Sequence, residues 1–332
     1  MSIRSFLRLS AHIQMLPVLE SGEETTLVGG QAVMEGVMMR APHSYCVAVR
    51  KSSGEIVTQE SPLPKVSEKY PIFKLPLLRG LGTLGHAMYL GVKALQFSAN
   101  VALEDLAPEE KGKAAEKPAE LSGWMMAAPL AFSLLFFLFM YKFVPLFLAT
   151  QIGKAFPAVH GRLAINLMDG VIRLAIFLAF LYLLSRMKDI RRMFEYHGAE
   201  HKVVFNFESG QPVNVENAQK FVTWHPRCGT SFLLLVMVIA ILVYSVLPFD
   251  GFAAKLVSRI ALLPLIVGIS YEIIRYAAKR QRGLMAAVTA PGLWLQRVTT
   301  QPPSNEQAAV AIHALEGAME LEKAQGGELV IA

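Results

Sequence analysis

Residues 230–249 read TSFLLLVMVIAILVYSVLPF, a run of twenty residues without a charge. A helix of this length reaches across the hydrocarbon core of a bilayer, because each residue adds about 1.5 Å to a core roughly 30 Å thick. Outward from this run, three further apolar stretches of similar length occur at 124–148, 163–185 and 256–276. Several such runs are not needed in a soluble protein. The sequence therefore predicts an α-helical integral membrane protein with about four transmembrane helices and a small mixed α/β cytoplasmic part.

The composition agrees with this class. Of 332 residues, 53% are hydrophobic and 17% are charged, and the mean hydropathy is +0.40. These values are high for a soluble protein. Two cysteines, Cys46 and Cys228, are too few for a disulfide framework and fit a reducing compartment. The N-terminus lacks the apolar core and small-residue cleavage site of a signal peptide, and the modest net charge of +6 gives no reason to expect a nucleic-acid partner.

The placement of charge predicts the topology. The segment 186–229 carries seven Lys and Arg residues, whereas the loops 150–162 and 250–259 carry two each. Positively charged loops stay in the cytoplasm. We therefore expect both termini and the segment 186–229 on the cytoplasmic side.

The expected organisation divides the chain into seven parts. They are a lead-in (1–27), a cytoplasmic region with a glycine-rich loop, a hairpin and an amphipathic helix (28–103), a linker (104–121), helices one and two (122–185), a cytoplasmic loop with the metal motif (186–229), helices three and four (230–276) and a cytoplasmic tail (277–332).

The candidate metal ligands are concentrated in the segment 186–229, the expected cytoplasmic loop. Residues 196–202 read YHGAEHK, so His197 and His201 lie four apart, on one face of a helix. That spacing allows both imidazoles to bind one metal ion, and Glu200 points to nearly the same side. Residues 225–231 read HPRCGTS and add His225 and Cys228, two further ligand types suited to zinc. The alternative is a pair of solvated histidines beside a membrane and one buried thiol.

The region before the first apolar run has its own pattern. The glycine-rich stretch 29–40 carries Gln31, Glu35 and Arg40 as its strongly polar side chains. It predicts either a tight turn beside a core strand or a loop that presents Glu35 and Arg40 to a site. Strands are expected at 45–49 and 55–59, joined by a turn at Ser52-Ser53-Gly54. A helix is expected from about 77 to 100, either on the membrane surface or packed under the polar region.

Further elements are expected in the polar segments. The second apolar helix should continue past the membrane through the histidine pair. A strand should follow at 202–207, then a turn at 209–212 and a short helix at 216–222. A last helix, from about 305 to 323, has an Ala/Val/Leu/Met face that we expect to pack on the N-terminal polar region.

The second apolar stretch contains two charges, Asp169 and Arg173, four residues apart. Arg173 falls near the bilayer midplane, where a lone charge costs at least roughly 2.5 kcal/mol. We therefore expect both side chains to face the bundle interior and to pair with each other or with Glu272. An interhelical ion pair that fixes packing is one interpretation, and a relay for transport is the other.

Four stretches together resemble one family, the YqhQ-like group of bacterial membrane proteins. They are GGQAVMEGVMMRAP (29–42), YHGAEHK (196–202), HPRCGTSF (225–232) and PGLWLQRVTT (291–300). The DGVIR sequence at 169–173 is similar to an acidic-Gly-x-x-Arg pattern of the same group. The resemblance covers about residues 28–315. The chain departs from the pattern at Pro302 and Ala309, where the group usually carries acids, so those two acids cannot be obligatory here.

The resemblance implies a protein of the bacterial inner membrane and, by the label often given to the group, a metal-dependent enzyme. His197, His201 and Cys228 are then the expected ligands of a divalent metal, zinc first, with His225 as a fourth. Glu200 is the expected general base, with Glu35 as its rival. An anionic small-molecule or lipid substrate would be held by Arg40, Arg227 and Gln31, although Arg227 fits a lipid-headgroup anchor equally well.

Three function classes remain open at this point. The first is a membrane-anchored metalloenzyme, with a hydrolase favoured, working at the cytoplasmic face. The second is an assembly or scaffold protein with a structural metal. The third is a transporter that uses Asp169 and Arg173. The oligomeric state does not follow from the sequence.

Overall fold

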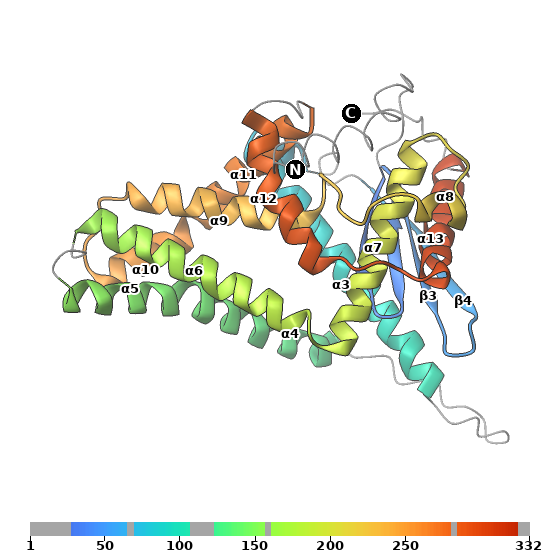
Figure 1. Ribbon diagram of the computed structural model, residues 1–332, viewed down its shortest axis with the longest axis horizontal. Coiled ribbons are helices and arrows are strands. Elements are labelled where there is room, and N and C mark those ends of the chain that lie inside the picture. The colour runs from blue at the N-terminus through green and yellow to red at the C-terminus, as the bar shows by residue number, and fades with distance from the viewer. Residues whose placement is uncertain (1–27, 65–69, 107–122, 157–160, 280–283, 325–332) are drawn as a thin grey trace, which may run out of the picture.

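The computed structural model describes residues 28–64, 70–106, 123–156, 161–279 and 284–324. The lead-in 1–27 and nearly all of the expected linker 104–121 lie outside the described residues. Figure 1 shows two parts, an elongated group of apolar helices and a body in which helices pack against a sheet.

The sheet has four antiparallel strands in the order β1-β2-β3-β4. They are β1 (Gly29–Val33), β2 (Gly36–Arg40), β3 (Ser44–Arg50) and β4 (Ile56–Pro62). The expected hairpin at 45–59 is confirmed as β3 and β4. The stretch 29–40 is a hairpin too, with Glu35 at a positive φ of 52° in its turn. The interpretation of this stretch as a tight turn beside a core strand is therefore confirmed, whereas its interpretation as a loop was wrong, because the backbone of both halves is paired residue for residue.

Helices cover both faces of the sheet. Side chains of successive strand residues point to opposite faces. Val37 and Met39 accordingly pack against α7 (Lys188–Glu208) and α13 (Asn305–Ala324), while Met38 packs against α3 (Leu78–Leu106). The last helix and its predicted contact with the N-terminal region are confirmed. The helix expected at 77–100 is confirmed as α3, and it packs against the sheet and α11.

The apolar part consists of several helices of unequal length. A π-helical turn, η2 (Phe139–Phe143), joins α4 (Gly123–Leu138) to α5 (Val144–Ala155). Next come α6 (Arg162–Leu184), α9 (Gly229–Ser245), α10 (Phe252–Ala261) and α11 (Leu263–Lys279). Among the described residues, Ala131–Ala155 and Arg162–Leu184 are long and apolar enough to cross a membrane. A third candidate is the pair α10 and α11, bent by 46°, whereas α9 is a shorter apolar helix. Four complete spans therefore stay a prediction.

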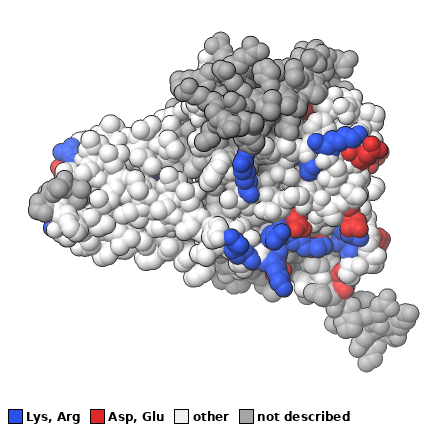
Figure 2. All heavy atoms as spheres, in the orientation of Figure 1, with Lys and Arg blue, Asp and Glu red and all other residues white. Residues whose placement is uncertain are grey.

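The surface of these helices is what a lipid environment requires. Phe132, Leu134, Leu135 and Phe136 of α4 are all at least half exposed. Figure 2 shows a surface almost free of charge along this part, with Lys and Arg gathered close to the sheet-containing body. An apolar surface of this extent on a soluble monomer would be unusual.

The segment 186–229 differs from the prediction in two places. α6 ends at Leu184 and α7 begins at Lys188 after a short turn, so one continuous helix was wrong. The strand expected at 202–207 was also wrong, because α7 runs on to Glu208. Ala199, Val203 and Phe207 lie four apart and pack against the sheet, and this helical stripe outweighs the β preference of the valines and phenylalanines. The turn at 209–212 and the following short helix, α8 (Val215–Gln219), are confirmed.

Candidate metal centre

The two histidines of α7 are oriented by backbone carbonyls. His197 Nδ1 lies 2.8 Å from the carbonyl oxygen of Thr299, and His201 Nδ1 lies 2.5 Å from that of Thr223. A carbonyl oxygen can only accept, so each Nδ1 carries the proton and donates it. In the neutral ring, each Nε2 then keeps its lone pair. This second contact is the usual way in which a metal-binding histidine has its tautomer and ring orientation fixed.

Cys228 completes a three-residue group. It stands at the N-cap of α9, and its Sγ lies 3.3 Å from His197 Nε2. One ligand atom each from His197, His201 and Cys228 lies within 4.8 Å of the others. That spacing is close to the roughly 3–4 Å between ligand atoms on one tetrahedral zinc ion. Two aromatic nitrogens with free lone pairs and one thiol fit a divalent ion such as zinc, so this group could hold a metal ion.

His225, the expected fourth ligand, lies beside the group but is engaged elsewhere. Its ring centroid is 5.7 Å from that of His201. Its Nδ1 accepts the backbone N–H of Arg227 at 3.3 Å, and its Nε2 lies 3.4 Å from Glu208 Oε2. Burial lowers the pKa of His225 to about 4, so the ring is neutral at pH 7. His225 is therefore a neighbour of the three-residue group and not a member of it.

Glu200 is buried between the helix and the first strand. Its Oε1 accepts the backbone N–H of Gly30 at 2.9 Å. Gly30 allows this close approach, because a Cβ there would lie 3.0 Å from Glu200 Cγ and would also overlap the carbonyl oxygen of Met38. Burial raises the pKa of Glu200, and His197 and His225 act in the opposite direction. A carboxylate with a raised pKa is a better proton acceptor near neutral pH.

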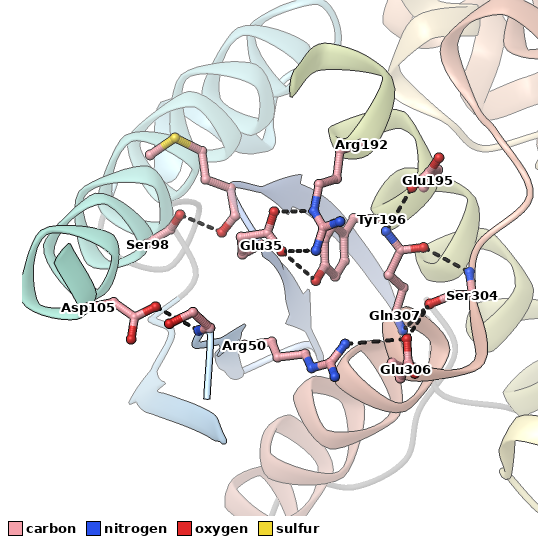
Figure 3. Close-up of polar contacts among 12 residues, drawn as sticks. Glu35, Arg50, Ser98, Asp105, Arg192, Glu195, Tyr196, Ser304, Glu306 and Gln307 are labelled. Atoms are coloured by element: carbon pink, nitrogen blue, oxygen red, sulfur yellow. Dashed lines mark hydrogen bonds and ion pairs between the residues drawn. The ribbon is translucent and has the colours of Figure 1, made fainter. Parts of the chain in front are cut away.

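Glu35 has a different position from the one expected of a general base. Figure 3 shows its carboxylate between Arg192 and Tyr196 of α7. It accepts from Arg192 Nε, from Arg192 Nη2 at 2.6 Å and from Tyr196 Oη at 3.2 Å. The Glu35 side chain is 37% exposed. These contacts tie the β1–β2 turn to the start of α7 and support a structural role.

Two of the three expected substrate-binding residues lie on the far face of the sheet. Gln31 Nε2 donates to the carbonyl oxygen of Ala87 in α3 at 3.1 Å. Arg40 shares that face by strand alternation, and burial lowers its pKa. α7 packs on the opposite face, so the sheet lies between these two residues and His197. Arg227, next to Cys228 in the chain, forms an ion pair with buried Glu208.

Several residues that build the surroundings of the group were missed at the sequence level. Gln296 accepts the backbone N–H of His225 at 2.6 Å and donates to its carbonyl oxygen at 2.9 Å. It lies in the stretch 291–300, so the motif there could have pointed to it. For Glu208, the one sequence feature that could have pointed to the site is its position at the end of a helix. The carbonyls of Thr223 and Thr299 have no sequence signal, because every residue carries one.

The predicted pair of Asp169 and Arg173 is present and has an additional partner. Arg173 Nη2 donates to Asp169 Oδ2, and Arg259 Nη2 of α10 lies 3.2 Å from the same oxygen. Both members of the pair are buried. Glu272 was the wrong alternative partner, because it pairs with Arg79 of α3.

Comparison with known proteins gives a family without an assigned activity. The family described as "Protein of unknown function (DUF1385)" matches residues 75–321. The "Uncharacterized protein YqhQ" of Bacillus subtilis (strain 168) is 36% identical over 299 residues, which cover 89% of this chain and 92% of that protein. No solved structure matches. The chain therefore belongs to the DUF1385 family, and the resemblance to YqhQ-like proteins is confirmed.

Proposed function

We propose that this member of the DUF1385 family is a metal-dependent hydrolase anchored in a membrane, with His197, His201 and Cys228 as the ligands of a divalent ion, zinc first. One observation carries the proposal. Both histidines donate Nδ1–H to a backbone carbonyl, so that in the neutral ring the lone pair of Nε2 is free for a ligand on the side of Cys228. A pair of solvated histidines has no need of this arrangement, whereas a metal-binding pair has its tautomer and ring orientation fixed in this way.

The number of ligands favours a catalytic over a structural site. Structural zinc sites are usually closed by four protein ligands, whereas catalytic sites have three. The fourth expected ligand, His225, has both ring nitrogens engaged with Arg227 and Glu208. When bound, the ion would supply Lewis-acid chemistry to a hydrolytic reaction.

Glu200 is the residue that we propose as general base. Gly30 fixes its Oε1, and Oε2 is the atom that would take the proton from the attacking water. Burial, which raises the pKa of this carboxyl, increases its affinity for that proton. Arg227 is the one remaining candidate among the three expected substrate-binding residues, since Gln31 and Arg40 lie across the sheet. Without a substrate, Arg227 is paired with Glu208, and an anionic substrate would compete with Glu208 for the guanidinium group.

The proposed location is the inner membrane of a bacterium, with the metal group on the cytoplasmic side. Two to three candidate spans and the exposed apolar side chains of α4 support insertion in a bilayer. The excess of Lys and Arg in 186–229 supports a cytoplasmic position for the group and for both termini. Labelling of a cysteine introduced at Ser209 from the outer face would overturn this topology.

Metal analysis of the purified protein tests the site directly. Protein expressed with added zinc and purified without chelators should hold about one zinc per chain. His197→Ala, His201→Ala and Cys228→Ser should each lose it. His313→Ala is the matched control, because His313 is exposed on α13 and pairs with Glu316 of the same helix. Wild-type protein without bound metal would overturn the proposal.

A structural metal in a scaffold protein is the second candidate. The observation in its favour is that the group joins α7 to two distant segments, through the carbonyls of Thr223 and Thr299. The variant Glu200→Gln distinguishes the hydrolase proposal from the scaffold proposal. Under the hydrolase proposal the variant keeps its zinc and its fold but loses hydrolysis in a panel of chromogenic esters and phosphoesters. Under the scaffold proposal wild type and variant are alike, and removal of the metal unfolds the body.

A further inference from the structure

A cluster of buried charges lies within the apolar helices, apart from the metal group. We define the charged cluster as Lys142 of η2, Asp169 and Arg173 of α6, and Arg259 of α10, arranged around Tyr244 of α9. Each of the five side chains is at most 7% exposed. Lys142 Nζ donates to Tyr244 Oη at 3.1 Å. Segments far apart in sequence thus bring their charges to one point inside the bundle.

The charges in this cluster do not balance. Arg173 and Arg259 both contact the single carboxylate of Asp169. Arginine stays protonated in proteins, so the two guanidinium groups alone exceed the carboxylate by one positive charge. Lys142 is a further basic group at the same place. Tyr244 presents its ring to all three, at 5.2 to 5.4 Å from the ring centroid, but a single ring face offers only a weak substitute for a counter-charge.

Arg259 is the cation with unused donors. Its Nη2 donates to Asn166 Oδ1 at 2.9 Å. Its Nε and Nη1 are buried and have no hydrogen-bond partner in the part of the chain that the structure describes, and the same holds for Arg173 Nη1. Asp169 Oδ1 is the one unpartnered acceptor in the cluster, against three unpartnered donors. A buried donor without a partner is costly, and a buried charge more so.

A small pocket lies against this arginine. Its lining contains the polar residues Asn166, Tyr244, Lys255, Ser258 and Arg259, closed by the apolar Leu247 and Phe249. It has room for about one water-sized species. It lies among the C-terminal end of α9, the following loop and α10, at the end of the bundle remote from the sheet in Figure 1. The pocket therefore combines Lys255 and Arg259 in its wall, an excess of positive charge in the adjoining cluster and room for about one small species.

We propose that this pocket is a binding site for a small monovalent anion of the size of chloride, held by Arg259 with Lys255 and Ser258 beside it. One such ion would neutralise the excess charge of the arginine pair and would contact Arg259 in the wall of the pocket. Lys255, at the edge of the pocket, would raise the local concentration of anions at its mouth. The proposal is independent of the metal group, which lies in the other part of the molecule.

Chloride-dependent stability tests this site. The purified chain in detergent is unfolded by heat in sodium chloride and in sodium gluconate at the same ionic strength, because gluconate is too large for the pocket. A saturable rise in Tm with chloride is expected, about 5 °C at a hundred times Kd. Arg259→Gln should abolish the rise. Arg162→Gln should keep it, since Arg162 is an exposed arginine at the same end of the bundle that pairs with Asp250.

A direct binding measurement covers the case in which Arg259→Gln fails to fold. Equilibrium dialysis of the wild-type protein with radiolabelled chloride should give about one retained ion per chain, and bromide should displace it. Arg259→Lys, which keeps one charge but loses the planar guanidinium group and its fork of donors, should bind chloride at least tenfold more weakly. The absence of retained chloride, or equal Tm values in chloride and gluconate, would overturn the proposal. So would stabilisation that follows added phosphatidylglycerol and not chloride, because the ligand would then be a lipid phosphate.

Discussion

The metal group of His197, His201 and Cys228 is largely buried and the charged cluster around Tyr244 is fully buried, yet they differ in how their polar atoms are used. In the metal group, each Nδ1 has a carbonyl partner, and both remaining ring nitrogens face a thiol. In the charged cluster, two guanidinium groups share one carboxylate, and three of their nitrogen atoms have no hydrogen-bond partner among the described residues. The first arrangement fits a cation and the second fits an anion.

The comparison shows that burial alone says little about function. A buried polar group is informative when the pattern of its satisfied and unsatisfied atoms can be matched to a ligand. Lone pairs that converge on one point can bind a metal cation, and N–H groups that converge on one point can bind an anion. The predictions below test this contrast by removing one feature at a time, from the largest expected effect to the smallest.

Removal of the carboxylate from the charged cluster should have the largest effect on stability. Asp169→Asn leaves two buried guanidinium groups without a counter-charge, and breaking a buried ion pair costs about 3–5 kcal/mol. The yield of folded protein should fall sharply, and the protein that survives should keep its zinc. Asp250→Asn is the control, because Asp250 is 74% exposed and should change stability by less than about 0.5 kcal/mol. A relay function would give the opposite result for Asp169→Asn, a normally folded protein without function.

Acid should lower the stability of the sheet-containing body, because the buried His225 beside the metal group resists protonation in the folded state. Its folded pKa of about 4 lies below the ordinary value of 6.5. The folded state therefore binds fewer protons than the unfolded state between these values. The stability from His225 is complete above about pH 6.5 and is lost as the pH falls towards 4, by up to about 3 kcal/mol. Thermal unfolding at pH 7.5 and pH 5 should show a smaller pH dependence in His225→Gln than in wild type. His313→Gln should behave as wild type.

The contact that orients His197 can be tested without touching a ligand. A Cβ at Gly198 would overlap the carbonyl oxygen of Gln301, two residues after the carbonyl that accepts from His197. Gly198→Ala should therefore push this segment away from α7, lower stability by about 1–3 kcal/mol and weaken zinc binding. Gly85→Ala is the matched control, because Gly85 is also a helical glycine but has open space at its Cβ position. It should be neutral or stabilising by up to about 1 kcal/mol. Equal zinc affinity in both variants would show that the orienting contact is dispensable.

The sequence predicted those features that depend on local spacing. The histidine pair, the β3–β4 hairpin and the last helix each follow from periodicity or turn chemistry within a short window. The strand expected at 202–207 failed because Val203 and Phe207 belong to a helical stripe whose partner, the sheet, lies far away in sequence. α9 is apolar throughout but has 17 residues and ends at Ser245, so composition alone overestimated its length as a span.

The partners of site residues were harder to predict than the residues themselves. Asp169 and Arg173 could be paired from their spacing of four residues. Arg259 could not be added, because the contact of α10 with α6 is a tertiary one. Gln31 and Arg40 were assigned to the metal site because they share a stretch with Glu35, yet strand alternation sends their side chains to the opposite face. A motif shows which residues are close in sequence. The alternation of side chains along a β-strand determines which of them lie on the same face of the sheet and can reach the same site.

The smallest effect is expected at Glu35, the rival of Glu200 for the role of general base. Glu35 is 37% exposed and its partner Arg192 is 52% exposed. Pairs of this kind contribute about 0–1 kcal/mol, because water screens the charges. Glu35→Gln keeps an oxygen that can accept from Tyr196, so we expect a loss below about 1 kcal/mol, unchanged zinc content and unchanged hydrolysis. Glu200→Gln should keep the zinc and lose hydrolysis, since its carboxylate is buried and fixed by Gly30. If Glu35→Gln abolished hydrolysis and Glu200→Gln did not, the β1–β2 turn would supply the base, and Glu200 would be a structural contact between α7 and β1.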